Sequence, residues 1–296
     1  MNNHITLSIC LPTYNRANYL NKLLNIIKQQ VFPNVEIVIS NNASIDNTQI
    51  VIEQFIKNNA HIKIVQINQP TNIGFDKNVL SVIMAASGDY CWLVSDDDTI
   101  LPDAINNILN LINSKPETSL FVTNYSRFDA KQNKITAKTM MNLPTDIALN
   151  DCNKFYFIPT PKSYFYILGT NMITMSANIF KRSLWIEASQ NTQQFIGLNF
   201  IHIFILTKIM SRHPSLYFIS KPQVQYLCNN HRQWNNDIWN DYKKYYLQHL
   251  KDIGFDKNNI DHIIKSKINR TTTKDKIYKV ILKIMQYLNI KPIIKK

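Results

Sequence analysis

The first 125 residues alternate between short apolar runs and segments whose apolar residues repeat at helical spacing. Residues 5–11 form a strand-like run that ends at Pro12, and residues 35–39 form a second. Between them, Leu20, Leu23 and Ile27 repeat as on one face of a helix. The pattern also predicts helices near 47–58, 77–86 and 103–113, and strands near 62–67, 90–94 and 119–125. Such alternation is typical of a mostly parallel sheet covered by helices on both faces, which is an α/β fold.

The second half of the chain has a weaker pattern. Scattered prolines and polar runs in residues 126–165 predict loops around an active site. A strand at Ile173–Ser176, a helix at Leu198–Met210 and a short strand at Leu216–Ile219 follow. From residue 229 the composition changes to aromatic and basic, which predicts a helical C-terminal region.

Charge is distributed unevenly along the chain, which has a formal net charge of +13. Residues 1–130 carry 8 Lys and Arg against 11 Asp and Glu, whereas residues 131–296 carry 25 against 9. A basic C-terminal surface attracts polyanions, whether nucleic acid, anionic lipid or phosphorylated substrate. The sign of the charge alone does not choose among these partners.

The cysteines, the N-terminal sequence and the longest apolar stretch indicate in which cellular compartment to expect the protein. Four cysteines occur without a CxxC pair, so neither a zinc site nor a disulfide framework is indicated. The N-terminus lacks the basic and apolar regions of a signal peptide, and the longest apolar stretch, 195–210, is interrupted by polar residues. We therefore expect a cytoplasmic protein with reduced thiols.

The most specific signal is the sequence Ser95-Asp96-Asp97-Asp98, directly after the apolar strand at 90–94. Adjacent carboxylates repel one another, and a cation at the end of the strand would neutralise them. Oxygen ligands of this kind suit Mg²⁺ or Mn²⁺. The alternative is an acidic turn before the next helix.

Three further polar stretches follow the other predicted strands: residues 12–16, 41–48 and 72–78. Parallel strands place their carboxyl ends at one edge of the sheet, where ligands bind. Four polar loops therefore predict a single crevice. Taken alone, Asp46 is as consistent with a helix N-cap, and Gly74 with a turn.

Over residues 5–110 the sequence resembles the family 2 glycosyltransferases of the GT-A fold. The resemblance rests on Pro12–Arg16, Asn42–Thr48, the stretch from Asn72 to Asn78, and Ala86-Ser87-Gly88-Asp89-Tyr90 leading to Asp98. It is strongest toward abequosyltransferase-like enzymes of bacterial surface polysaccharides. It implies a GT-A catalytic domain over 1–228, with a nucleotide-sugar half over about 1–125 and an acceptor half over about 126–228, and a basic helical extension over 229–296.

The resemblance also implies a site for a nucleotide-diphosphate sugar. Asp98 and Asp96 would hold Mg²⁺ or Mn²⁺. Lys77 stands where relatives commonly have Arg, and Asn41 where many have an Asp that accepts from a uracil N–H. An amide leaves uridine and cytidine open, and we expect UDP before CDP or dTDP because it is commoner. The sugar-donor residues implied are Pro12, Thr13, Tyr14, Asn15, Arg16, Asn41, Asn42, Asn72, Gly74, Lys77, Asp96 and Asp97.

The general base is implied less directly. In the helix that starts near 201, His202 stands where relatives carry the catalytic Asp, and Lys208 where they carry an Arg. A histidine can accept a proton at neutral pH, although a His packed in an apolar helix explains the sequence equally well. Asp129, Asp151 and His213 are lesser candidates.

These expectations combine into an inverting, metal-dependent transfer of a sugar to a hydroxyl of a lipid-linked or growing surface polysaccharide such as O-antigen, capsule or lipooligosaccharide. Residues 229–296 carry 15 Lys and Arg against 6 Asp and Glu, which fits helices lying on the inner face of an anionic membrane or packed on the domain. The alternatives are a sugar-phosphate nucleotidyltransferase, disfavoured because no Gly-rich loop follows the first strand, and a nucleic-acid-binding module, disfavoured by the acidic crevice. We expect no nucleic-acid partner.

Overall fold

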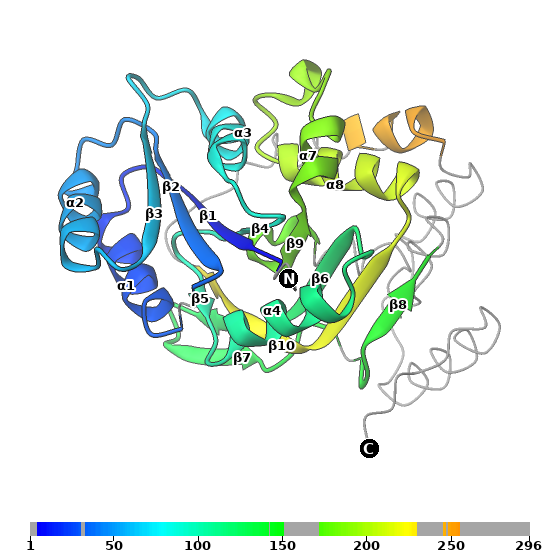
Figure 1. Cartoon of the computed structure of the whole chain (residues 1–296), viewed down its shortest axis with the longest axis horizontal. Helices are drawn as coiled ribbons and strands as arrows, with labels where there is room; N and C mark the ends of the chain where they lie inside the picture. Colours follow the sequence, from blue (N-terminus) through cyan, green and yellow to red (C-terminus); the bar gives the residue numbers. More distant parts are fainter. Residues whose placement is uncertain are drawn as a thin grey trace.

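The computed structural model describes residues 5–30, 33–141, 143–150, 172–229, 245–246 and 248–254. Within these residues, ten strands form one sheet with the order β3-β2-β1-β4-β9-β6-β10-β5, while β7 pairs with β6 and β8 with β10 (Figure 1). The strands are β1 (Leu7–Thr13), β2 (Val35–Asn41), β3 (Lys63–Asn68), β4 (Tyr90–Leu93), β5 (Thr99–Ile100), β6 (Leu120–Asp129), β7 (Lys134–Ala137), β8 (Ile147–Leu149), β9 (Asn178–Lys181) and β10 (Leu216–Cys228).

Helices cover both faces of this sheet (Figure 1). They are α1 (Ala17–Ile27), α2 (Thr48–Asn58), α3 (Phe75–Ala85), α4 (Ala104–Ser114), α7 (Arg182–Ala188) and α8 (Ile201–Arg212), with short 3-10 helices at Met175–Ala177 and Gln193–Phe195. Apolar side chains of α1, α2 and α4 join one buried cluster, and those of α3, α7 and α8 join the other. Because strand residues alternate between faces, the α1, α2 and α4 cluster takes every second residue of β1 and β2, while the other cluster takes Cys10 and Val38 from between them. The predicted α/β architecture is confirmed.

Strand direction places the site. Strands β3, β2, β1 and β4 are all parallel. β2 and β3 lie on one side of β1, and β4 lies on its other side. Beyond β4 the sheet is mixed, because β9 runs antiparallel to both β4 and β6 while β6 and β10 are parallel. The switch point therefore lies between the carboxyl ends of β1 and β4, where open α/β sheets bind ligands.

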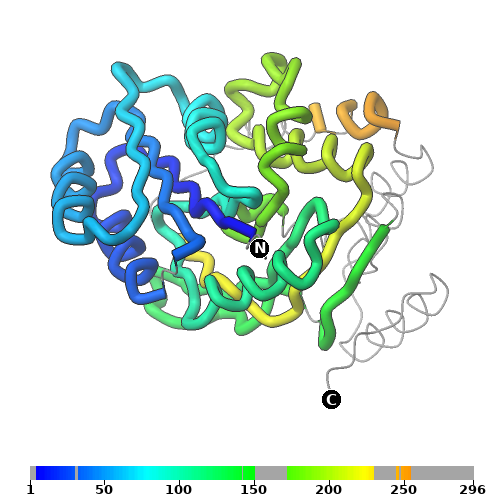
Figure 2. Tube along the Cα trace, viewed as in Figure 1, coloured from blue at the N-terminus to red at the C-terminus, as the bar shows by residue number. Residues whose placement is uncertain are grey.

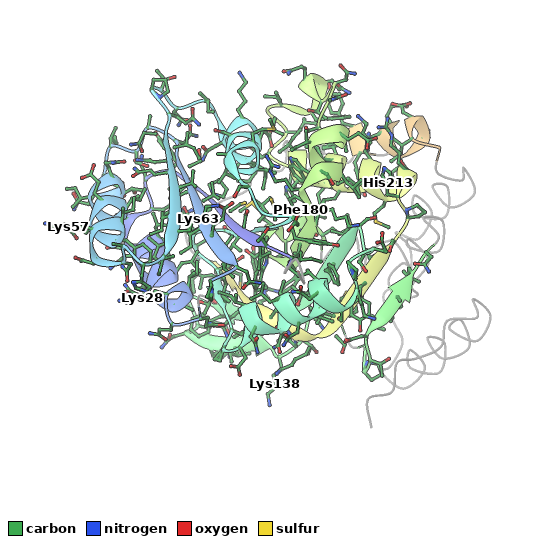
Figure 3. All side chains as sticks on the ribbon, in the orientation of Figure 1. Lys28, Lys57, Lys63, Lys138, Phe180 and His213 are labelled. Atoms are coloured by element: carbon green, nitrogen blue, oxygen red, sulfur yellow. The ribbon has the colours of Figure 1, made fainter. Side chains whose placement is uncertain are left out.

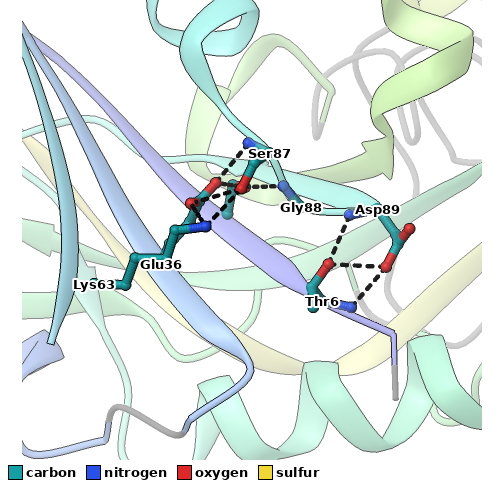
Figure 4. A network of polar contacts seen from close by, with 7 residues as sticks. Thr6, Glu36, Lys63, Ser87, Gly88 and Asp89 are labelled. Atoms are coloured by element: carbon teal, nitrogen blue, oxygen red, sulfur yellow. Dashed lines mark hydrogen bonds and ion pairs between the residues drawn. The ribbon is translucent and has the colours of Figure 1, made fainter. Parts of the chain in front are cut away.

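The Ser87-Gly88-Asp89 part of the motif lies at the opposite, amino end of these strands (Figure 4). The Asp89 carboxylate accepts hydrogen bonds from the backbone and hydroxyl of Thr6, 2.9 and 2.8 Å away. Gly88 is required because an added Cβ would lie 2.6 Å from the Ser8 hydroxyl. The buried Glu36 carboxylate accepts from Lys63, Ser8 and Ser87. This network fixes where the strands begin and is remote from the crevice.

Two expectations for the second half were wrong, and a third gave a strand that was too short. Residues predicted to be loops include the end of β6, then β7 and β8. The residues expected as a strand, Ile173–Ser176, instead contain a bend at Thr174 followed by the start of a 3-10 helix, and the strand follows at Asn178–Lys181. The short strand at Leu216–Ile219 continues to Cys228 as β10, because the register shift between Ile219 and Val224 accommodates Pro222.

The described part of the C-terminal region packs on α8. Figure 2 shows residues 248–254, in orange, beside that helix. Leu250 is fully buried, the ring centroids of Tyr246 and Phe204 lie 5.8 Å apart, and the His249 ring lies 3.0 Å from the Thr207 hydroxyl. The basic stretch expected to meet a membrane, after residue 254, lies outside the described residues.

Two further observations concern thiols and membranes. Cys10, Cys91 and Cys228 are free and buried, as expected, while Cys152 lies outside the described residues. No helix in the described ranges has the length and apolar character needed to cross a bilayer.

The side chains of Lys28, Lys57 and Lys138 project outward from the domain, whereas the Phe180 ring stacks against Trp185 in its interior (Figure 3).

Candidate active site

Hydrogen bonds join the loops that follow β1, β2, β3 and β4. The Thr13 hydroxyl donates to the Asp96 carboxylate over 2.8 Å, and the Arg16 guanidinium lies 3.9 Å from the Asp97 carboxylate. The Asn42 amide donates to the Asn72 side chain over 3.0 Å. The structure therefore brings the four predicted loops together in one crevice. Pro12, Thr13, Asn42 and Asp96 are buried there.

The loops after β1 and β2 are tied residue by residue. The backbone N–H of Asn15, which adopts a φ of 52°, donates to the Ser44 hydroxyl, and the Asn15 side chain accepts from the Ile45 N–H. Asp46 accepts from the backbone at the start of both α1 and α2, at Ala17 and Thr48. Its role is thus to fix the two helices. Tyr14 remains 41% exposed at the rim.

The orientation of the Asn41 amide is fixed by its neighbours. Its oxygen accepts from the Ser44 backbone N–H over 3.1 Å, and its nitrogen donates to the Gln49 oxygen over 3.0 Å. A backbone N–H can only donate, so the amide cannot be flipped. The Gln49 nitrogen in turn donates to the Glu53 carboxylate. Asn41 therefore keeps one N–H to donate and a second oxygen lone pair to accept, both in a fixed orientation.

Asn72 and Gly74 shape the loop before α3. The Asn72 side chain accepts from the Gly74 N–H over 2.9 Å, and Gly74 has a φ of 83°, which confirms the turn role. Lys77, in the first turn of α3, is exposed near this loop. Asn72, Gly74 and Lys77 thus lie at the crevice mouth.

The triplet is held by a 3-10 helix and a strand from the second half of the chain. The Ser176 hydroxyl donates to one Asp98 oxygen over 2.6 Å, and the Leu227 backbone N–H donates to the other over 3.0 Å. The Ser95 hydroxyl donates to Asp97. Asp98 is only 4% exposed. Burial, together with the neighbouring Asp97 and Asp96 carboxylates, raises the pKa of Asp98 to about 8 although both donated hydrogen bonds oppose the shift.

A divalent cation would relieve this electrostatic cost. Each oxygen of Asp98 accepts one hydrogen bond and so keeps a lone pair, and Mg²⁺ typically takes only one or two carboxylates and completes its shell with phosphate oxygens and water. No group of three or more His, Cys, Asp or Glu side chains gathers as a metal site within the described ranges. The carboxylates therefore fit a cation that arrives with a diphosphate better than one held by the protein alone.

A cavity of about 300 Å³ opens beside the triplet. That volume lies at the small end of the range for ligand sites. Its walls come from α3, the triplet loop, β6, the start of α8 and the end of β10. They are lined by Phe75, Ser95, Asp97, Asp98, Arg127, Ile173, Thr174, Met175, Asn199, Phe200, His202, Tyr226, Leu227, Cys228 and Asn229.

His202 lines this cavity and is 2% exposed. Its Nε2 lies 3.1 Å from the Ile173 carbonyl oxygen, which can only accept, so Nε2 carries the proton. Nδ1 has no hydrogen-bond partner among the described residues. Burial lowers the pKa of His202 to about 4, with the Ile173 carbonyl opposing the shift. The ring is therefore neutral at pH 7, with an unprotonated nitrogen.

Two other candidates for the base, Asp129 and His213, and the expected Lys208 are engaged in other contacts. The Asp129 carboxylate accepts from the backbone of Lys131 and Gln132 and from the Asn229 side chain, which lowers its pKa. His213 lies at the far end of α8, 3.5 Å from Glu187. Lys208 donates to the Ala188 and Gln190 carbonyls. Asp151 lies outside the described residues.

Sequence reasoning missed several site residues. Arg127 on β6 and Tyr226 on β10 are register partners at the carboxyl ends of those strands and line the cavity. Both lie after the predicted ends of their strands, at residues 125 and 219. They therefore could not be found among the residues placed at the carboxyl ends of the predicted strands. Asp76, beside Lys77, was also missed, because the backbone N–H groups that donate to it lie more than 120 residues further along the chain.

Comparisons with known proteins agree with this geometry. A family model described as "Glycosyl transferase family 2" matches residues 8–182. Abequosyltransferase RfbV of Salmonella typhimurium is 29% identical over 223 residues, which cover 74% of this chain and 65% of that relative. The GalNAc(5)-diNAcBac-PP-undecaprenol beta-1,3-glucosyltransferase of Campylobacter jejuni is 32% identical over 107 residues, 36% of this chain and 34% of that protein. The chain thus spans less than two thirds of either relative.

Solved structures show the same fold at low sequence identity. Staphylococcus aureus TarS 1–349 in complex with UDP aligns with a TM-score of 0.64 at 14% identity, covering 96% of this chain and 78% of that one. The mannosyltransferase PcManGT of Pyrobaculum calidifontis, in complex with GDP-Man and Mn²⁺, aligns with a TM-score of 0.58 at 14% identity, covering 97% and 76%. Since the family model matches more than half of the sequence, the chain belongs to glycosyl transferase family 2.

Proposed function

We propose that this chain is an inverting, metal-dependent glycosyltransferase that moves a sugar from a nucleotide-diphosphate donor to a hydroxyl of a surface glycan. The observation that carries the proposal is the position of Asp98. It lies buried at the switch point of the sheet, between the four-loop crevice and the cavity that holds His202. A sugar bound near Asp98 would have its nucleotide on one side and its acceptor on the other.

The nucleotide occupies the crevice over β1 and β2. Adjacent strands lie about 4.8 Å apart, so the end of β2 is roughly 10 Å from the end of β4. This separation suits a nucleoside whose diphosphate lies at the triplet and whose base lies near Asn41. Arg16 and Lys77 supply positive charge along this path.

Two bases remain candidates. UDP is the donor expected from the sequence, and TarS, which shares the fold, has been solved with UDP. The contacts of Asn41 leave both bases open, because the amide keeps an N–H to donate to cytosine N3 and its oxygen keeps a second lone pair that can accept from the uracil N3–H. Competition between UDP, CDP and dTDP for the protein measures this preference directly.

The acceptor hydroxyl enters the cavity. Neutral His202 donates Nε2–H to the Ile173 carbonyl, and its unprotonated Nδ1, which is buried and has no hydrogen-bond partner among the described residues, would accept the proton of the attacking hydroxyl once the acceptor reaches it. In-line attack at the anomeric carbon then breaks its bond to the diphosphate and inverts its configuration, with no covalent enzyme intermediate. A cation bound at Asp98 and Asp96 supplies charge neutralisation for the departing diphosphate.

The acceptor class follows from the relatives. The Campylobacter relative is named for an undecaprenol-linked acceptor, and the Salmonella relative is named abequosyltransferase. We propose a lipid-linked or growing polysaccharide acceptor, presented at the cytoplasmic face of the membrane. The basic segment after residue 254 would hold the enzyme there through anionic headgroups.

Product analysis tests the proposal against its alternatives. The protein is incubated with Mn²⁺ and a panel of nucleotide sugars, chosen by the rise in melting temperature that binding to the folded state produces. Release of a nucleoside diphosphate supports the glycosyltransferase. Release of pyrophosphate from a nucleoside triphosphate and a sugar phosphate would instead identify a nucleotidyltransferase, and the absence of both reactions would contradict an enzymatic role.

A further inference from the structure

A buried carboxylate links the helix beside the nucleotide crevice to the helix that carries His202. Asp76 is the second residue of α3 and is 1% exposed. One of its oxygens accepts from the backbone N–H groups of Gly197 and Asn199, 2.8 and 2.9 Å away, and the other accepts from the Ile201 N–H, 3.1 Å away. All three N–H groups belong to the approach to α8.

The segment that wraps Asp76 has an unusual backbone. Gly197 adopts a φ of 97° and Asn199 a φ of 60°, both in the left-handed region. These conformations turn successive N–H groups toward one carboxylate. The first turn of a helix has N–H groups without intrahelical partners, and Asp76 satisfies that of Ile201 from a different helix. The carboxylate therefore determines where α8 begins and how the preceding loop is folded.

The neighbours of these groups line the catalytic cavity. Phe75, next to Asp76, forms one wall, and Asn199, Phe200 and His202 form another. On the other side of Asp76, Lys77 stands at the mouth of the nucleotide crevice. We propose that Asp76 is a positioning residue that fixes the His202 wall of the acceptor cavity relative to the nucleotide-binding loops. The proposal rests on the proposed function, since it assigns Asp76 a role in that reaction.

Asp76→Asn is the direct test. An amide keeps one acceptor oxygen, but its NH2 group replaces the other. Either the Ile201 N–H, or the N–H groups of Gly197 and Asn199, would then face a donor and lose their acceptor. A shift of the cavity wall by about 1 Å can cost 10²-fold in rate. We expect the rate of nucleoside diphosphate release, with water as acceptor and the best-binding nucleotide sugar plus Mn²⁺, to fall roughly 10–100-fold. The affinity for the free nucleoside diphosphate should stay within about twofold, because the nucleotide-binding loops are unchanged.

Asp146→Asn is the matched control. Asp146 also accepts three hydrogen bonds, from the Tyr217 hydroxyl and from the backbone and hydroxyl of Ser220, but does not line the cavity. Its loss should lower the melting temperature and leave turnover per folded molecule unchanged. Gly197→Ala provides a second lesion in the Asp76 loop. It strains the backbone at a positive φ without touching a charge, and it should reproduce the turnover defect.

The outcomes separate the two claims. A selective loss of turnover in Asp76→Asn or, if that variant does not fold, in Gly197→Ala supports the positioning role. Normal turnover per folded molecule in the folded variants, or a parallel loss of nucleotide affinity, overturns that role while leaving the proposed function standing. A wild-type protein that neither binds a nucleoside diphosphate nor releases one overturns both.

Discussion

The chemistry proposed for this chain depends on two buried side chains, His202 and Asp98. Burial lowers the pKa of the first and raises the pKa of the second, and so favours the neutral form of both. Burial keeps His202 neutral and Asp98 costly to ionise. A neutral imidazole is ready to accept a proton, and a carboxylate that is costly to ionise gains most from a cation. Neither property can be read from the residue type, because an exposed His or Asp would have neither.

At the residue scale, His202→Ala should lower transfer by roughly 10²–10⁴-fold, the usual contribution of a positioned base, with nucleotide affinity unchanged. Because the pKa of His202 is lowered to about 4, the acidic limb of the wild-type pH–rate profile should fall near pH 4 and not near 6.5. Steady-state rates from pH 3 to 8 measure this.

His249→Ala is the control for that experiment, since burial also lowers the pKa of His249 to about 4 but its ring packs behind α8. It should lose stability and keep transfer per folded molecule. If His202→Ala behaves in the same way, His202 is a packing residue and its role as base is wrong.

At the element scale, the two edges of the sheet have separate tasks. The carboxyl ends of β1–β4 carry the ligand-binding loops, and the amino ends are fixed by the network of Glu36, Ser87, Gly88 and Asp89 (Figure 4). Burial alone would raise the pKa of Glu36, but hydrogen bonds from Lys63, Ser8 and Ser87 outweigh it and lower the pKa to about 2. Ser87, Gly88 and Asp89 therefore stabilise the amino ends of the strands. They also lead directly into β4, whose carboxyl end carries the candidate site.

Glu36→Gln should consequently destabilise the protein. The folded pKa lies below the usual value of about 4.5, so the stabilisation is present above pH 5 and is lost as the pH falls from about 5 to 2. We expect a loss of roughly 2–3 kcal/mol at pH 7, part of the pKa shift being screened at the exposed Lys63, and a loss of roughly 1 kcal/mol at pH 3, where part of the stabilisation is still present. Urea denaturation at both pH values measures the difference, with exposed Glu53→Gln as control. An equal loss at both values would contradict the electrostatic account.

The elements that the sequence predicted were those fixed by local pattern. β1 to β4 and the helices between them follow from apolar periodicity, and the crevice follows from strand direction. The errors have tertiary causes. Pro222 breaks the local pattern of β10, yet the neighbouring β6 carries the strand past it. Asp76 could not be assigned either, because its partners lie more than 120 residues away.

At the scale of the whole molecule, the C-terminal region contains at least one part that belongs to the catalytic domain. Tyr246, Leu250 and Ile253 join the same apolar cluster as α3, α7 and α8. Packing on α8 therefore continues beyond the expected boundary at residue 229, which stays a prediction. Membrane binding is proposed only for the basic stretch further on.

Two truncations separate these roles. Removing residues 274–296 should release the protein from anionic vesicles and leave donor hydrolysis intact, since clustered Lys contribute about 1 kcal/mol each near such a surface. Removing residues 245–296 should also destabilise the domain, because burying Leu250 alone is worth about 2–5 kcal/mol. Vesicle sedimentation and thermal denaturation measure the two effects. If the protein that lacks residues 274–296 sediments with vesicles as the wild type does, the membrane role of this segment is wrong.

The most direct test of the central claim is the rate of nucleoside diphosphate release with Mn²⁺ for the wild type and for Asp98→Asn. The amide can still accept from the Leu227 N–H and can donate to the Ser176 hydroxyl, so the fold should be kept and the melting temperature should not fall. A neutral amide is a poor ligand for a hard cation. We predict at least a roughly 100-fold loss of rate, matched by EDTA treatment of the wild type. Near-normal release by a folded Asp98→Asn protein, or full wild-type activity in EDTA, would contradict the account.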